Sequence, residues 1–488
     1  MAYIHIYGGF GEIGGNKIFI SSRDGAIFLD FGLNLKKKRE YSLGYGVERT
    51  SRILKNYLLI NLLPNIRGIY RSDLSEEIEI KHSEKVDVDA CIISHAHLDH
   101  YGLVGFLESN VKIAVSKSMK ALIEHSIETS GRTGVEGEVF NYRDKKLEEE
   151  SRKHKSKRHA KHVERPIVIF EERRKIPNIP VHIEPHPVDH SIPASFGFII
   201  EVDGVSIAYT GDIRLHGVVH HYTESFIEKA RDVEYLIVEG TRIEDSGSFS
   251  EEDVKQSMMK EIQKKSGKFV AVLTSSLDID RVRTTIEVAE ECGRTVILSP
   301  RIFHLISTLK SVESRVKIPE ITYAKVYFEK RSIIDGGYFL DSSHYRSWLK
   351  KLYKQLADKD MLVKSEEVKR CQEKYLMIFT GPQYLYEFID IEPSPGSLLI
   401  ISTSEPHDEE QEIEWEKAEN WINLLRLDSR WIHSSGHANR EDLLEIIKKI
   451  NPKNLVPVHT ENPREYVKLA EKENLKCRIL LTERINLE

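Results

Sequence analysis

Four potential metal ligands fall within six residues, and this string constrains the fold more than any other part of the sequence. The string H-A-H-L-D-H runs from His95 to His100 and follows the apolar stretch 90–93. That stretch predicts a buried strand, so the ligands come directly after a strand end. Imidazole and carboxylate groups together suit zinc and similar metals. We expect His95 and His97 to bind one ion, and Asp99 and His100 to face a second.

Length and composition bound the class of protein. A chain of 488 residues is too long for one ordinary core, so at least two domains are expected. No apolar run of 18 residues occurs, so no membrane partner is expected. The N-terminus does not read as a secretory signal and the four cysteines are scattered singly, which together predict a cytoplasmic protein. The net charge of −6 does not exclude a nucleic-acid partner, because a basic groove can lie on an acidic body.

The pattern of predicted secondary structure changes near residue 241. Before it, short β-branched runs bounded by glycine predict strands at 3–7, 17–20, 26–30, 90–93, 167–170, 196–202, 205–210 and 235–238. After it, predicted helices at 250–265 and 279–292 alternate with strands at 269–274 and 296–299, as in a parallel sheet covered by helices. We therefore expect an α/β domain over 1–240, a second α/β domain inserted over 241–397, and a return of the first domain over 398–488.

Two segments have no predicted task in this scheme. Residues 36–84 receive no assignment. The stretch 152–165 carries seven lysines and arginines against one glutamate. It is either a solvated loop or an arm that contacts phosphates, and both alternatives stay open.

The H-x-H-x-D-H string after a strand resembles the signature of the metallo-β-lactamase superfamily, whose fold is an αββα sandwich with metals at one edge. Three further residues match motifs of that family. Asp30 in FLDFG resembles the aspartate that supports the metal loop. His190 in DHSIP resembles the next metal ligand, and Asp212 in TGDI resembles the carboxylate that bridges two ions. The resemblance implies two Zn²⁺ ions per chain, with Mn²⁺ as an alternative for the same ligands.

Three more motifs resemble those of the β-CASP nucleases within that superfamily. Glu239 in VEGTR matches motif A, His437 in SSGHA matches motif B, and His459 in PVHT matches motif C. The segment between A and B has the place of an inserted β-CASP α/β domain, which covers the metal site and leaves a cleft for nucleic acid. The N-terminal GGFGEIGG resembles the start of the ribonuclease J family. The expected fold is therefore an α/β metallo-β-lactamase sandwich with an inserted β-CASP domain.

The resemblance also implies a role for each ligand. The first ion would be held by His95, His97 and His190, the second by Asp99, His100 and His459, and both by Asp212. Two divalent ions carry four positive charges, of which two aspartates and one bridging hydroxide neutralise three. The remaining charge suits an anionic oxygen of a phosphodiester, whose phosphorus atom the hydroxide would attack.

Other residues would act on the substrate. His437 would face the scissile phosphate, and Glu239 would orient its ring. Ser435 would donate to a non-bridging phosphate oxygen. His433 would either do the same or be a histidine at a strand end with no contact to the substrate, and both alternatives stay open. Histidines at 182, 186 and 216 are expected to be surface or supporting residues.

The resemblance favours RNA over DNA as the substrate, because histidine in motif C tends to mark RNA-processing members of the family. A DNA nuclease of repair or defence on the same fold remains the alternative. The large insertion disfavours a hydrolase of small molecules, and the complete ligand set disfavours an inactive binding subunit. Exonuclease or endonuclease action, a homodimer and the biological pathway stay open.

Overall fold

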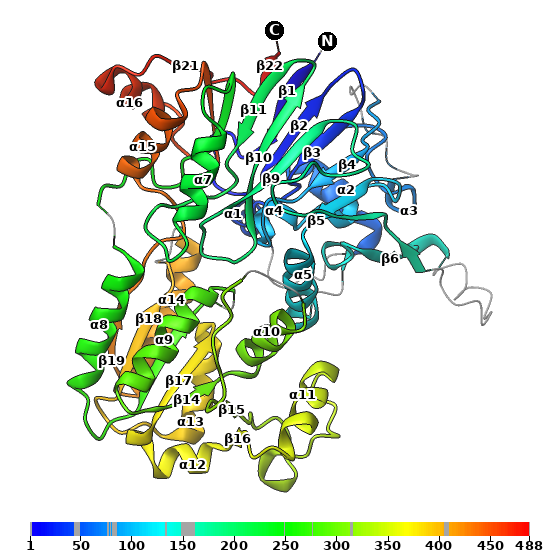
Figure 1. The fold of residues 1–488 in the computed structure, drawn as a ribbon. Coiled ribbons are helices and arrows are strands. Elements are labelled where there is room, and N and C mark those ends of the chain that lie inside the picture. The colour runs from blue at the N-terminus through cyan, green and yellow to red at the C-terminus, as the bar shows by residue number, and fades with distance from the viewer. Residues whose placement is uncertain are drawn as a thin grey trace.

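The chain forms two bodies, an upper one with two sheets and both chain ends, and a lower one with a third sheet (Figure 1). The computed structural model describes residues 2–42, 49–75, 78, 80, 85–131, 134–147, 162–247, 249–275, 277–312, 316–404 and 409–487. Of the stretch 152–165, residues 152–161 lie outside the described residues, as do parts of 36–84. Among the helices described, none is both long enough and apolar enough to cross a membrane.

The upper body is built on two mixed sheets. The first has, in spatial order, β22 (Arg484–Asn486), β1 (Tyr3–Gly8), β2 (Lys17–Ser21), β3 (Ala26–Leu29), β4 (Ala90–Ile92), β5 (Lys112–Val115) and β8 (Ile167–Ile169). The second has β21 (Arg478–Ile479), β20 (Asn454–Val458), β12 (Tyr235–Glu239), β11 (Val205–Tyr209), β10 (Ser195–Val202) and β9 (His182–Val188). Strands β3, β4, β5 and β8 are parallel, as are β11, β12 and β20. Their carboxyl ends therefore share edges of the two sheets.

Helices complete the layers of the upper body. They are α1 (Leu35–Glu40), α2 (Thr50–Leu59), α3 (Ser72–Ser75), α4 (Leu98–Tyr101), α5 (Lys117–Ser130), α7 (His221–Lys229), α15 (Arg440–Ile450) and α16 (Glu465–Glu473), with short 3-10 turns at Val104–Phe106 and Val135–Gly137. Successive residues of β12 face different layers: Ile237 packs into the core between the sheets, whereas Leu236 and Val238 pack with α7, α15 and α16. A small hairpin, β6 (Asn141–Arg143) and β7 (His162–Glu164), lies outside the two sheets. The predicted αββα sandwich is confirmed.

The lower body is a parallel sheet covered on both faces. Its strands, in spatial order, are β16 (Leu362–Val363), β15 (Lys325–Tyr327), β14 (Thr295–Leu298), β17 (Tyr375–Thr380), β13 (Val270–Thr274), β18 (Leu398–Ser402) and β19 (Asp428–Trp431). Its helices are α8 (Glu251–Gln263), α9 (Ile279–Glu291), α10 (Pro300–Lys310), α11 (Ser347–Ala357), α12 (Ser365–Arg370), α13 (Phe388–Ile391) and α14 (Glu409–Leu424), with 3-10 turns at Asp335–Gly337, Gln372–Lys374 and Pro382–Glu387. Val272 packs with Met258 of α8 on one face, and Leu273 packs with Phe388 of α13 on the other. The all-parallel pairing explains why both faces are apolar.

The expected boundary at residue 398 falls inside the third sheet. Strand β18 pairs with β13, and β19 pairs with β18. The proline and glycine cluster at 392–396 makes a turn that leads into β18, and such clusters mark turns within a domain as readily as linkers between domains. As a correction, we propose that the inserted domain extends to Trp431 and that the first domain resumes after it.

Candidate metal centre

The predicted ligands come from separate strand ends that meet at one edge of the upper body. Four of them follow β4, and one follows each of β9, β11 and β20. They are His95, His97, Asp99, His100, His190, Asp212 and His459. Their ligand atoms fall into one group around His97 and one around Asp99, and a third group, of Asp212, His437 and His459, connects the two. The structure thus brings together all seven residues that the sequence singles out as ligands.

The first group is a convergence of three imidazoles and a carboxylate. His97 Nδ1 lies 3.1 Å from His95 Nε2 and 3.1 Å from His190 Nε2. Asp212 Oδ2 lies 3.5 Å from His95 Nε2. Burial lowers the pKa of His95, of His190 and of His97, in the last case to about 4. These rings are therefore neutral at physiological pH, the form in which imidazole binds a metal.

The second group lies on the other side of Asp212. His459 Nε2 is 3.1 Å from Asp99 Oδ2, and His100 Nε2 is 3.2 Å from Asp212 Oδ2. Asp212 Oδ1 is also 3.5 Å from His459 Nδ1. Burial opposes the charged form of Asp212, but the surrounding histidines, His100 first, hold the pKa of its carboxyl well below the usual range. A permanently charged carboxylate between two groups of nitrogen donors suits a bridging position.

Two atoms at the centre of the cluster test whether a metal fits. His100 Nε2 and Asp212 Oδ1 are buried and have no hydrogen-bond partner among the described residues. Buried polar atoms without a partner are costly, and neutral imidazole nitrogens packed 3.1 Å apart gain little from one another. Bound cations would give His100 Nε2 and Asp212 Oδ1 a partner, and they would also bind the closely packed nitrogens of the neutral imidazoles. The cluster is a metal-binding site.

Buried partners fix the ring orientations of the ligands. His100 Nδ1 donates to Asp30 Oδ2 at 2.8 Å, and His190 Nδ1 donates to the Gly436 carbonyl at 2.6 Å. In both rings, Nε2 is left to face the centre, the arrangement by which outer partners tune metal ligands. Asp30 was expected to support the metal loop, and it also accepts from Ser94 N at 2.7 Å and from Tyr209 OH at 2.7 Å. Sequence patterns did not indicate the role of Tyr209.

Glycines allow the close approach of the chain around Asp99. A Cβ on Gly32 would lie 1.6 Å from the Asp99 carbonyl oxygen, so no other residue fits there. Gly14 has φ +78° and faces the Asp99 side chain, where a Cβ would lie 3.0 Å from Asp99 Cβ. The Gly9 carbonyl accepts from His459 N at 2.6 Å. The N-terminal glycine turn therefore packs around the second ligand group.

His437 and Glu239 form a pair beside the metal cluster. His437 Nδ1 lies 3.0 Å from both carboxylate oxygens of Glu239, and 3.9 Å from Asp212 Oδ2. Glu239 is fully buried, whereas the His437 side chain is 22% exposed, so part of the imidazole is accessible to solvent. Burial disfavours the charged ring, but Glu239 raises the pKa of His437 to about 9. The imidazole is therefore protonated at neutral pH and can donate a proton.

The two other predicted substrate residues lie on the loop before His437. Ser435 is half-buried, and its Oγ accepts from His437 N at 3.2 Å. His433 Nδ1 accepts from Arg281 Nη1 at 3.2 Å. Burial, followed by the charge of Arg281, lowers the pKa of His433 to about 3, so this ring is neutral. Of the three other histidines, His216 contacts this loop by donating from Nε2 to the Ser435 carbonyl at 3.0 Å.

Thr241 is a further residue that the sequence did not single out. Its Oγ1 lies 3.0 Å from His459 Nδ1, where it fixes that ligand's ring. Thr241 lies two residues after Glu239, and a single threonine at that position forms no recognisable sequence motif. Only the register of β12 against β20 brings Thr241 to His459.

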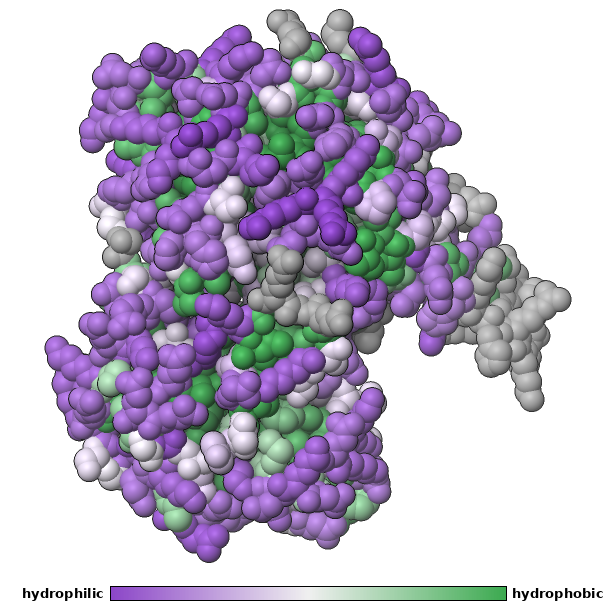
Figure 2. All heavy atoms as spheres, in the orientation of Figure 1, coloured by the Kyte–Doolittle hydropathy of each residue, from purple (hydrophilic) through white to green (hydrophobic). Residues whose placement is uncertain are grey.

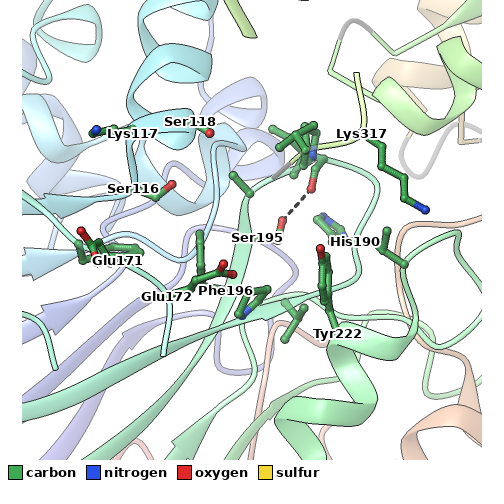
Figure 3. Close-up of a pocket in the computed structure, with 18 of the residues that line it drawn as sticks. Ser116, Lys117, Ser118, Glu171, Glu172, His190, Ser195, Phe196, Tyr222 and Lys317 are labelled. Carbon is green, nitrogen blue, oxygen red and sulfur yellow. Dashed lines mark hydrogen bonds between the residues drawn. The ribbon is translucent and has the colours of Figure 1, made fainter. Parts of the chain in front are cut away.

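A cavity of about 400 Å³ lies beside His190, lined by residues of both bodies (Figure 3). Its wall combines aromatic residues such as Phe196 and Tyr222 with polar ones such as Ser118 and Lys317. The Ser195 hydroxyl donates to the Ile192 carbonyl at 2.9 Å within this wall (Figure 3). In the view of Figure 2, hydrophilic side chains dominate the surface, and apolar ones show in separate patches on the upper body and around the waist. The metal centre thus lies at the junction of the two bodies.

Comparison with known proteins agrees with this geometry. Residues 56–274 match the beta-lactamase superfamily domain, and residues 425–480 match the Zn-dependent metallo-hydrolase RNA specificity domain. The chain is 23% identical over 499 residues to ribonuclease J of Methanocaldococcus jannaschii, covering 96% of this chain and 94% of that protein. It is 24% identical over 404 residues to ribonuclease J of Sinorhizobium meliloti, covering 79% of this chain but only 60% of that protein.

One solved structure matches over its whole length. A protein of unknown function from Enterococcus faecalis is similar over 100% of both chains, with a TM-score of 0.75 and 22% identity. This likeness supports the fold alone.

Proposed function

Because this chain is a β-CASP protein of the metallo-β-lactamase superfamily that resembles ribonuclease J, we propose that it hydrolyses phosphodiester bonds of RNA at a centre of two zinc ions. The observation that carries the proposal is the pair of Glu239 and His437, which places a protonated imidazole 3.9 Å from the shared carboxylate Asp212. A metal site alone would suit many hydrolases. A metal site with an adjacent acid suits the cleavage of an ester whose leaving oxygen needs a proton.

Support for RNA over DNA comes from the C-terminal match. The segment 425–480, which resembles an RNA specificity domain, contains both His437 and His459. These residues contribute to the metal centre and its acid, so the matched segment is part of the site. The relatives named above are ribonucleases J.

We propose the following division of ligands. His95, His97 and His190 hold one ion, and Asp99, His100 and His459 hold the other, with Asp212 shared. Bound as a pair, divalent ions supply an activated water and stabilise charge on the attacking and leaving oxygens. Zinc fits the donor set, and manganese accepts the same ligands.

The chain's own residues would do the remaining chemistry. Glu239 holds the ring of His437 through Nδ1, so that Nε2 is available to the substrate. From there, His437 would stabilise a phosphate oxygen or give its proton to the leaving 3′ oxygen. Ser435 would donate to a non-bridging oxygen. His433, whose pKa is lowered by burial and then by the charge of Arg281, would contribute a neutral imidazole to the same loop.

Matched RNA and DNA oligonucleotides, 5′-phosphorylated and labelled at either end, would test the proposal with zinc or manganese. We expect hydrolysis of RNA, loss of activity in Asp212→Ala, and a reduced rate with unchanged metal content in His437→Ala. His182→Ala, at a partly exposed histidine on β9, is the control and should match the wild type. Mononucleotides released from the 5′ end would indicate an exonuclease, and internal cuts an endonuclease. Preference for DNA, or a wild type no faster than Asp212→Ala, would overturn the proposal.

A further inference from the structure

We propose that Arg214 and Arg281 are positioning residues that hold the loop 433–437, and through it His437, against the metal centre. Arg214 belongs to the upper body, two residues after Asp212, and Arg281 lies on α9 of the lower body. Both side chains are fully buried. The proposal rests on the function proposed above, in which His437 acts on the phosphate.

Three successive carbonyls of the loop are held by side chains from outside it, and the middle one, of Ser435, accepts from both Arg214 and His216. Arg281 Nη2 donates to the Ser434 carbonyl at 3.4 Å, and Arg214 Nη1 donates to the Ser435 carbonyl at 3.3 Å. The third carbonyl, of Gly436, accepts from the metal-ligand ring of His190. Because each peptide group is planar, fixing its carbonyl also fixes its N–H. Side chains outside the loop therefore fix the orientation of the backbone that precedes His437.

Arg281 is itself held rigidly by the lower body. Its Nε and Nη2 donate to the two carboxylate oxygens of Glu251, at 2.9 Å each. Its Nη1 donates to Ser402 Oγ at the end of β18 and to His433 Nδ1. A bidentate pair fixes the plane of a guanidinium, so the direction of its remaining N–H groups is fixed too. The inserted domain thus supplies a rigid donor to the motif-B loop.

Arg214 ties the same loop to the metal-ligand segments. Its Nε donates to Asp189 Oδ1 at 3.0 Å, and its backbone N donates to the Asp189 carbonyl at 2.9 Å. Asp189 directly precedes the ligand His190. Arg214 Nη2 also reaches Asp280 Oδ2 of α9 at 3.4 Å. One side chain therefore contacts the metal-ligand loops, the His437 loop and the lower body.

Buried ion pairs are a poor source of stability, because desolvating two charges offsets most of their attraction. Apolar side chains would stabilise this interface as well, but they would not orient carbonyl groups. The arrangement is therefore better explained by a need to place the loop precisely. A displacement of about 1 Å is enough to reduce a rate by about 100-fold.

The double variant Glu251→Gln/Arg281→Gln tests the proposal, because it removes both charges of the bidentate pair together. The matched control is Arg294→Gln. Arg294 is also a buried arginine of the lower body, and it donates to the carbonyls of Lys265, Lys268 and Tyr375 at 3.0 Å each, before the amino end of β14. Hydrogen exchange of the zinc-loaded proteins, followed by mass spectrometry, reports on peptides that span 433–438. We expect exchange there to rise at least about 10-fold in the double variant and to stay unchanged in the control.

Kinetics on RNA provides the second test. We expect the double variant to lose about 10- to 100-fold in kcat, with metal content and KM unchanged. If the hydrogen bonds of Arg281 to the loop act on the rate through His437, the same double substitution in a His437→Ala background will cause no further loss of kcat. Losses that multiply, or loop exchange that matches the wild type, would overturn the positioning role. If the wild type cuts no RNA, the proposed function fails, whereas the exchange measurement still decides whether the arginines hold the loop.

Discussion

The support of the metal loop by Asp30 leads to a quantitative prediction for Asp30→Asn. The carboxylate is fully buried and accepts four hydrogen bonds. Oδ2 accepts from Ser94 Oγ at 2.8 Å, from His100 Nδ1 at 2.8 Å and from Tyr209 OH at 2.7 Å. Oδ1 accepts from Ser94 N at 2.7 Å. An asparagine has one acceptor oxygen, which we expect to remain at the Oδ2 position because three donors converge there.

The expected loss of stability follows from the hydrogen bonds that the amide group of Asn cannot make. Its NH₂ would face the buried N–H of Ser94, and an unpaired buried donor costs about 1–3 kcal/mol. The bond from His100 would lose its charge assistance, which costs about 1 kcal/mol more. We therefore expect the free energy of unfolding to fall by about 2–4 kcal/mol. Because His100 is no longer fixed as firmly, zinc affinity should fall about 10- to 100-fold.

Competition with a chromogenic chelator would measure the zinc affinity, and urea denaturation of the metal-free proteins would measure stability. Asp89→Asn is the matched control. Asp89 also accepts a backbone N–H, from Ala26 at 3.0 Å, but it contacts no predicted ligand. An Asp30→Asn protein that binds zinc as tightly as the control would refute the reasoning that Asp30 sets the orientation of His100.

Three further predictions concern the acid, the lower body and the ions. Glu239→Gln removes the charge that raises the pKa of His437 to about 9, so kcat should fall about 10- to 100-fold with metal content, measured by mass spectrometry, unchanged. Burial, reinforced by Glu329, raises the pKa of Glu387 to about 7 from an unfolded value of 4.5. Native protein therefore binds the extra proton between these values, and stability falls as pH rises through them. Glu387→Gln should be more stable than the wild type by about 1–3 kcal/mol at pH 8 and equal to it near pH 4, as measured by urea denaturation. Removing metal with a chelator should lower stability, and zinc at 100 times its Kd should restore about 2.7 kcal/mol, measurable as a shift of the melting temperature.

The clustering of the predicted ligands could be foreseen from sequence because most of them belong to short local patterns. Four of them lie within the string that starts at His95, and Asp212 follows the predicted strand 205–210, but no strand was predicted directly before His190. The carboxyl ends of neighbouring parallel strands meet at the same edge of a sheet. Residues that directly follow such strands are therefore expected to lie close together. The individual roles assigned to them here, and to His437, remain predictions.

The boundary of the insertion and the supporting residues could not be predicted in the same way. The turn before β18 has the composition of a linker, and only the pairing of β18 with β13 shows that the sheet continues. No spacing pattern in the sequence singles out Arg214, Arg281 or Thr241, because each contacts residues that are distant in the sequence. An isolated arginine is usually a solvated surface residue, and nothing local distinguishes these two.

The position of the inserted domain explains how it can cover the site without displacing the acid. The chain leaves the upper body directly after Glu239 and returns to it directly before His437. The two connections are held side by side by a parallel bridge between Arg242 and Asn439. The Glu239–His437 pair therefore forms where both ends of the insertion are anchored. The β-bridge and the two buried arginines connect the lower body to the upper one there, so His437, the proposed acid, can keep its distance from the metal centre while the rest of the insertion accommodates a polymeric substrate.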